Sequence, residues 1–210
     1  SIDAGDSNVA VGYQAGYAMT TASNQVAIGD GALKAATIGG DNVAVGGYMA
    51  LGSLTEGIRN NAVGHSAGHS LTIGDYNDFI GYQAGYSNVH GDYNVGMGRS
   101  SLRNNAPADG SGKNVAIGGL AAYGGASNAM TGSVFIGYAS GYYTTGNANV
   151  AIGYGALEGD SGTYGADSNI SIGYQSMKSA TSATENVVVG MSAGYDITTG
   201  SGNVAMGYQA

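Results

Sequence analysis

A five-residue segment, which typically has one polar residue, three apolar residues and a glycine, recurs along the whole chain. The first copy, Asn8 to Gly12, has the sequence Asn-Val-Ala-Val-Gly, and its final glycine is the marker glycine of the copy. The marker glycines are Gly12, Gly29, Gly46, Gly64, Gly81, Gly98, Gly118, Gly137, Gly153, Gly173, Gly190 and Gly207. Their spacing of 16 to 20 residues is too short for a unit with its own core. The pattern therefore predicts one all-β solenoid array over residues 1–210, built from about twelve stacked coils.

Two apolar columns, which we call the flanking columns, lie one and three residues before each marker glycine. They hold only Val, Ile and Met, apart from Asn61 and Asp78. Residues two apart on a strand share a face, so these columns predict one β-branched wall. We expect this wall to line the inside of the coil. The core residues predicted from it are Val11, Ile28, Val45, Ile80, Ile117, Ile136, Ile152, Ile172 and Val189.

The middle column, two residues before each marker glycine, points to the opposite face of the strand. A lone solenoid would carry polar residues there, but this column is mostly small and apolar. Apolarity on both faces is typical of a sheet that is covered on both sides. We therefore expect the middle column to contact other copies of the chain in a homo-oligomer. The predicted interface residues are Ala10, Ala27, Ala44, Phe79, Ala116, Phe135 and Ala151.

Asparagine opens the segment in ten copies, and Gln25 and Ser133 take its place in the other two. Stacked asparagine amides can form a hydrogen-bonded ladder, which this column predicts. The marker glycine is expected to supply a positive φ, or room for a close backbone approach. A second strand is expected to begin three residues later, at small residues such as Ala15 and Ala84.

Composition narrows the possible classes of protein. Forty glycines argue against long helices, whereas 10% charged and 43% apolar residues argue against disorder. Fourteen acids against six Lys and Arg give a net charge of −8, which argues against nucleic acid as a partner. No apolar run reaches the roughly 20 residues of a membrane helix. Neither end carries the polar cap that a solenoid needs, so we expect a segment of a longer fibre.

Two sequences fit the Gly-x-Ser-x-Gly pattern of hydrolases and contain Ser66 and Ser192. Equivalent positions in other copies hold Gln14 and Gln83, so the repeat itself explains both matches. The hydrolase motif also needs a following helix, which the sequence does not predict. We therefore expect no catalytic residues and no enzyme activity.

The sequence predicts neither a cofactor nor a metal site. His65 and His69 have the spacing of a metal pair on a helix, but on a coil they replace tyrosines of the next copy. Asp75, Asp78 and Asp92 would hold Ca²⁺ only if they gathered at one edge, and solvated turn acids are the favoured interpretation. The glycosylation sequon at Asn169 lies on a predicted strand, where we expect it to be inaccessible.

Tyrosine often follows the marker glycine directly. Stacked tyrosines stabilise a shaft, and they can also contact sugars. The candidate binding residues for a surface glycan or a protein receptor are Tyr13, Tyr82, Tyr138, Tyr154 and Tyr174. The three longest turns, over residues 103–113, 123–132 and 158–168, are expected to bulge from the shaft and to offer further ligand contacts.

The pattern Asn-Val-Ala-Val-Gly-Tyr-Gln-Ala resembles the head repeat of the YadA-like trimeric adhesins, and it is closest to the form found in bacteriophage tail fibres. The resemblance extends over all twelve copies. It implies a left-handed parallel β-roll and a side-by-side homotrimer that presents a host-binding surface, on a virion or at a cell surface. We therefore expect a structural segment of a phage tail fibre. The alternatives are a bacterial trimeric adhesin or secreted filament and, less favoured, a glycan-degrading fibre enzyme.

Overall fold

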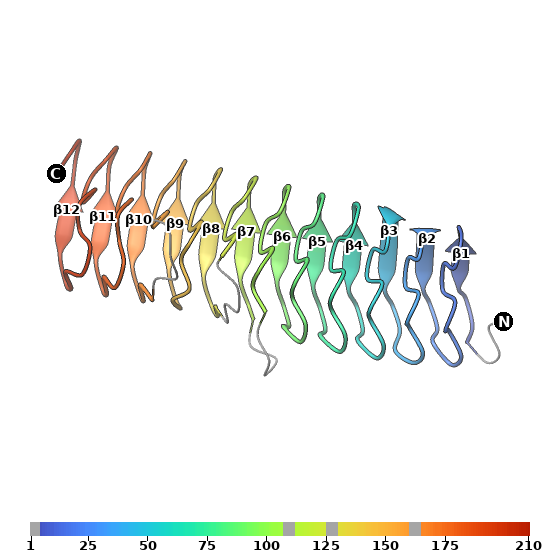
Figure 1. Ribbon diagram of the computed structural model, residues 1–210. Helices are drawn as coiled ribbons and strands as arrows, with labels where there is room; N and C mark the ends of the chain where they lie inside the picture. Colours follow the sequence, from blue (N-terminus) through green and yellow to red (C-terminus); the bar gives the residue numbers. More distant parts are fainter. Residues whose placement is uncertain (1–4, 107–111, 125–129, 160–164) are drawn as a thin grey trace.

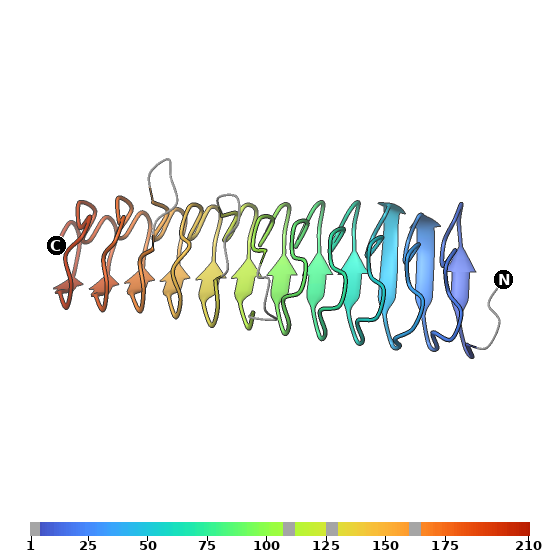
Figure 2. The same ribbon diagram turned by 60° about the horizontal axis from the view of Figure 1, so that its bottom comes forward.

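The computed structural model describes residues 5–106, 112–124, 130–159 and 165–210, and in this part the chain folds as a parallel β-solenoid (Figure 1). Successive coils lie side by side in one row, as Figure 2 shows from a second direction. The strands are β1 (Val9–Val11), β2 (Val26–Asp30), β3 (Val43–Tyr48), β4 (Asn61–Val63), β5 (Asp78–Ile80), β6 (Val95–Met97), β7 (Val115–Ile117), β8 (Val134–Ile136), β9 (Val150–Ile152), β10 (Ile170–Ile172), β11 (Val187–Val189) and β12 (Val204–Met206). No helix occurs in these residues. The predicted all-β solenoid is thus confirmed.

The twelve strands form one parallel sheet in which each strand pairs only with those one coil before and after it. The pairing joins equivalent positions, as in Val150 with Ile170 and Ala151 with Ser171. The three residues before the marker glycine keep this register in every pair, so their columns become straight rows along the stack, whereas the pairing of β2 with β3 shifts by one residue after the glycine. Residues in a row are one strand spacing apart, about 4.8 Å.

The predicted second strand is absent from the described coils. The chain after the marker glycine turns instead, with φ of 55° at Gln83 and 60° at Gly85. Left-handed residues so close together bend the backbone and prevent extended pairing. Only β2 and β3 continue past the marker glycine, to Asp30 and Tyr48.

Two features require glycine at the marker position: the backbone conformation there and a close contact with the next coil. Gly81 has a φ of 136°, which disfavours any residue with a Cβ. A Cβ on Gly81 would also lie 2.6 Å from the carbonyl oxygen of Gly98 on the next coil. Both expected roles, positive φ and close approach, are therefore present at the same position.

The prediction of which strand face points into the coil is wrong. Ala27, Ala44, Phe79, Ala116, Phe135 and Ala151 of the middle column are fully buried inside the coil, although they were predicted to be interface residues. Ala10, in the first coil, is exposed. The flanking columns point outward: Val11, Ile28, Ile80, Ile117 and Ile136 are exposed, and Val45, Ile152, Ile172 and Val189 are half-buried.

The narrow cross-section of the coil explains this inversion. The wall opposite the strand brings Leu33, Leu51, Leu102 and Leu157 into the interior, where all four are fully buried. These leucines leave room for only a small residue in the middle column of the same coil. In these coils the larger β-branched residues of the strand therefore face outward.

The two phenylalanines of the middle column show the same volume limit. The residue six positions after Phe79 is Gly85, and the residue six positions after Phe135 is Gly141. A Cβ at Gly85 would lie 2.5 Å from the Phe79 ring, and one at Gly141 would lie 2.2 Å from the Phe135 ring. Each large side chain is therefore accommodated by a glycine opposite it.

The predicted asparagine ladder is present and fully buried over most of its length. Asn77 donates from its backbone N and its Nδ2 to Oδ1 of Asn60, both at 3.0 Å. Nδ2 of Asn77 also donates to the carbonyl oxygen of Gly91, at 2.8 Å. Asn94 repeats the pattern on Oδ1 of Asn77. The ladder thus joins each strand to the turn before the next one, inside an apolar coil where unpaired polar groups are costly.

Gln25 interrupts the ladder, so the substitution Gln25→Asn should stabilise the fold. The Gln25 side chain is fully buried, and neither its Nε2 nor its Oε1 has a hydrogen-bond partner. Restoring the amide geometry of the other coils should raise the free energy of unfolding by ~1–3 kcal/mol. Chemical denaturation measures this change. The reverse substitution, Asn42→Gln, is the matched control and should destabilise, whereas equal stability of all three proteins would contradict the prediction.

Candidate functional surface

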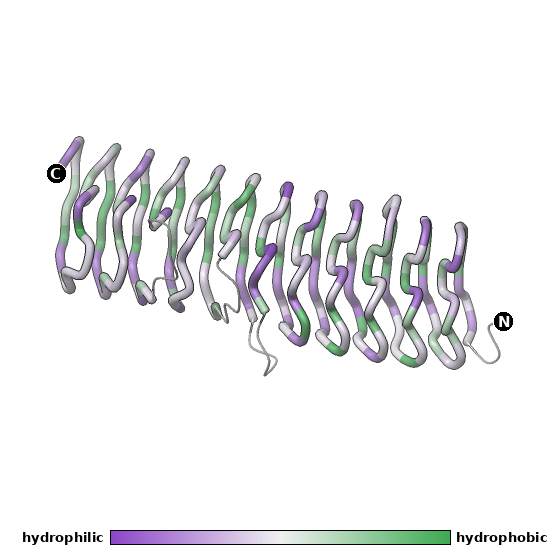
Figure 3. The backbone as a smooth tube through the Cα atoms, in the orientation of Figure 1, coloured by the Kyte–Doolittle hydropathy of each residue, from purple (hydrophilic) through white to green (hydrophobic). Residues whose placement is uncertain are grey.

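The outward flanking columns form a long apolar stripe, which we call the sheet face. Its exposed members range from 36% exposure at Ile136 to 72% at Val204. The others are Val9, Val11, Ile28, Val63, Ile80, Met97, Ile117, Ile170 and Met206. Figure 3 shows hydrophobic residues following one another on successive strands. At ~4.8 Å per strand, the sheet face is about 50 Å long.

An apolar surface of this extent is unusual for a soluble monomer, whose contiguous apolar patches seldom exceed a few hundred Å². Apart from Met97 and Met206, the apolar side chains of the sheet face are β-branched and stiff, and therefore lose little entropy when they are covered. The surface is also regular, because each row repeats the row before it. A stiff and regular apolar surface can pack well against a partner whose side-chain rows have the same spacing.

The predicted tyrosine residues lie on the surface, in a row that directly follows the marker glycines. Their exposed fractions range from 48% at Tyr82 and Tyr138 to 73% at Tyr13. Tyr154 stacks on Tyr138 and Tyr174, with ring centroids 5.4 and 5.3 Å apart. Stacking covers the ring faces inside this group, which leaves ring edges and hydroxyl groups for other contacts.

A second aromatic row, five residues after the marker glycines, was not predicted. The ring of His69 stacks on Tyr86 at 4.9 Å, and the Arg103 guanidinium lies 5.1 Å from the Tyr86 ring and 5.6 Å from the Tyr123 ring. Tyr123 then stacks on Tyr142 at 4.9 Å. The sequence contains the information that predicts this row, because each of these residues lies five positions after its marker glycine. Such stacked and cation–π contacts tie successive coils together.

The burial of His69 predicts that stability decreases in mild acid. Partial burial lowers the pKa of His69 below its ordinary value of 6.5. The folded protein therefore takes up this proton less readily than the unfolded chain, and stability should fall as the pH drops below about 6.5. In His69→Phe the ring stacking is retained and this contribution is lost. Melting curves between about pH 8 and pH 5.5 should decline less steeply for the variant, and parallel declines would contradict this.

The two serines of the hydrolase-like motif occupy ordinary repeat positions. Ser66 Oγ lies 3.1 Å from Nδ1 of the adjacent His65, and the His65 ring stacks on Tyr82 and makes a tilted contact with Tyr48. The positive φ of Ser66, 56°, is matched by 55° at Gln83 in the next coil. The backbone of Ser66 is therefore a property of the coil and is not specific to serine.

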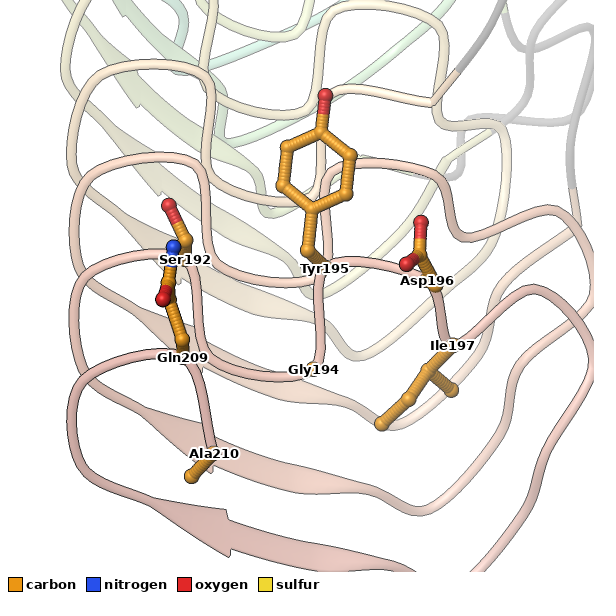
Figure 4. Close-up of a pocket in the computed structure, with 7 residues that line it drawn as sticks. All are labelled: Ser192, Gly194, Tyr195, Asp196, Ile197, Gln209 and Ala210. Carbon is orange, nitrogen blue, oxygen red and sulfur yellow. The ribbon is translucent and has the colours of Figure 1, made fainter.

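Ser192 lines a hollow of about 560 Å³ at the C-terminal end of the stack (Figure 4). Ser192 and Gln209 lie at the same corner of successive coils, while Asp196 lies on the far side of Tyr195. The hollow is also lined by Ile197, at a position that a following coil covers elsewhere in the stack. It therefore reflects the end of the described stack and does not define a ligand site.

The candidate metal residues do not converge. Oδ1 of Asp75 accepts a hydrogen bond from the backbone N of Ile58, and Oδ1 of Asp92 accepts one from the backbone N of Asp75, both at 2.8 Å. His65 and His69 belong to the two separate aromatic rows described above. Within the described residues, no group of three or more His, Asp or Glu side chains could hold a metal ion.

The remaining sequence-based candidates concern a sequon and three turns. Asn169 is fully buried in the asparagine ladder, where it donates to Oδ1 of Asn149 and the carbonyl oxygen of Ala183. It is therefore inaccessible, as expected. The three long turns contain residues 107–111, 125–129 and 160–164, which lie outside the described residues, so the prediction of ligand contacts there stays a prediction.

No protein-family model, curated protein or solved structure matches this chain. The described residues contain no helix of the length and apolarity that crossing a membrane requires. The physical case for a function therefore depends on the solenoid and its sheet face.

Proposed function

We propose that the chain is a rigid segment of a homotrimeric fibre, in which the sheet faces of neighbouring copies pack against one another. The exposed apolar sheet face carries this proposal. In a monomer it would leave Val and Ile side chains in water along the whole stack, and covering them would stabilise an assembly at roughly 25 cal/mol per Å². A second copy fits this surface because it presents the same residues at the same spacing.

The number three and the biological setting follow from the resemblance of the repeat to phage tail fibres and YadA-like adhesin heads. In the proposed role, the segment belongs to a bacteriophage tail fibre and supports attachment of the virion to its host. The described fold favours a mechanical role, since backbone hydrogen bonds and side-chain ladders join every coil to the next. A bacterial adhesin would use the same assembly at a cell surface, and the genes beside the full reading frame distinguish the two.

Two neighbouring residues on β7 provide a direct test of the assembly. Ile117 faces outward, so Ile117→Lys should preserve the fold but place three charges in the interface and release monomers. Ala116 is fully buried, so Ala116→Lys should destabilise the coil itself by more than about 3 kcal/mol. Light scattering measures the assembly, and circular dichroism during denaturation measures the fold.

The wild-type chain is the reference in the same two measurements. It should scatter as a trimer over a broad concentration range. A stable wild-type monomer, or trimers of unchanged stability from Ile117→Lys, would contradict the proposed interface.

The tyrosine row provides a separate prediction for host attachment. Because the ring faces are stacked, contacts to a glycan should use the hydroxyl groups. The triple substitution of Tyr138, Tyr154 and Tyr174 to Phe preserves the stack and removes these groups, and it should lower glycan-array binding by the assembled protein about tenfold or more. Assembly measured by light scattering should be unchanged, and binding equal to that of the wild type would exclude this row as the binding surface.

A further inference from the structure

One polar pair interrupts the sheet face. Asn61 on β4 and Asp78 on β5 occupy equivalent positions of adjacent strands, and Nδ2 of Asn61 donates to Oδ1 of Asp78 at 2.6 Å. Asn61 is exposed and Asp78 is half-buried. Every other residue of the two flanking columns is Val, Ile or Met. The pair therefore distinguishes one position along the axis of the stack from the rest of the apolar surface.

A uniform surface creates a difficulty for the proposed assembly. If one copy slides along another by one coil, Val and Ile still meet Val and Ile, and only one of the twelve rows loses its partner. Repetitive strands without distinctive residues specify register weakly. The apolar contacts alone would therefore allow several alignments of nearly equal energy.

The polar pair removes this degeneracy, because its contacts depend on alignment. In a copy that has slipped, the Asp78 carboxylate would be buried against an apolar row, which is strongly unfavourable. In aligned copies, each pair meets an identical pair at the same height. The Asn61 amide carries two hydrogens, and the bond to its own Asp78 uses only one of them.

We infer that the Asn61–Asp78 pair sets the axial register between copies of the chain, through hydrogen bonds from each Asn61 to Asp78 of a neighbouring copy. This inference rests on the proposed function, since it requires the sheet faces to be packed together. Three carboxylates at one height repel one another, and the amide groups between them offset this repulsion by donating to two carboxylates each. A single buried polar residue fixes register in some coiled coils by the same principle.

The test moves the pair by two coils. A shifted variant carries Asn61→Val, Asp78→Val, Val95→Asn and Val115→Asp, which places the same pair on β6 and β7. Wild-type and shifted chains of different mass are unfolded together, refolded and examined by native mass spectrometry. Each protein should form its own trimers, and mixed trimers should fall about tenfold or more below their statistical share.

The matched control carries Val95→Ile and Val115→Ile, which changes the same two positions without adding polarity. It should mix statistically with the wild type. Statistical mixing of the shifted variant among stable trimers would overturn the register inference and leave the proposed function intact. A monomeric wild-type protein would overturn both, and preferential self-assembly of the shifted variant would support both.

A second measurement applies if the shifted variant does not fold. The chain contains no cysteine, so Ile136→Cys and Ile152→Cys, on the adjacent strands β8 and β9, introduce single cross-linking sites. The two single-cysteine proteins are mixed and assembled in the wild-type background. One register should then fix the ratio of matched disulfides, which join the same position in two chains, to offset disulfides, which join position 136 of one chain to position 152 of another. Adding Asn61→Val and Asp78→Val should change this ratio severalfold, because slipped alignments become accessible. An unchanged ratio would overturn the inference.

Discussion

The structure depends on the stacking of each coil on its neighbour in constant register. Backbone hydrogen bonds join equivalent residues of successive strands, and the asparagine ladder continues the same connection into the turns. Each coil therefore satisfies its polar groups mainly through the next coil and not within itself. This arrangement explains why a unit of 16 to 20 residues can fold without its own core.

Constant register also converts single residue types into rows with collective properties. The marker glycine of one coil lies against the carbonyl of the next, so a side chain at one glycine disturbs two coils. The aromatic residues of successive coils lie about one strand spacing apart, which is close to the distance of stacked rings. Stacked Tyr138, Tyr154 and Tyr174 are thus a consequence of register, whatever further role their hydroxyl groups have.

The repeat predicted much of the fold, including the parallel sheet, the asparagine ladder and the need for glycine. It failed on the direction of the strand faces, because large apolar residues were assumed to point inward. The missing quantity was the volume inside one coil. A clue was present within the chain: Phe79 and Phe135 are each followed six residues later by glycine, whereas Ala27 and Ala151 are followed at that position by leucine. Such compensation occurs between residues that share a core, so it places the middle column inside.

The corrected orientation strengthens the case for assembly and changes its chemistry. A face of alanines would offer little apolar area to a neighbouring copy, whereas the actual sheet face offers Val and Ile along the full stack. In the proposed assembly, the uniformity of this surface would also make the contacts unspecific in register, since the apolar rows match at any multiple of the coil spacing. A fibre that transmits force needs its chains to end at defined heights. In the proposed assembly, an apolar surface with a single polar interruption satisfies both requirements, because the apolar rows would supply affinity and the Asn61–Asp78 pair would supply alignment.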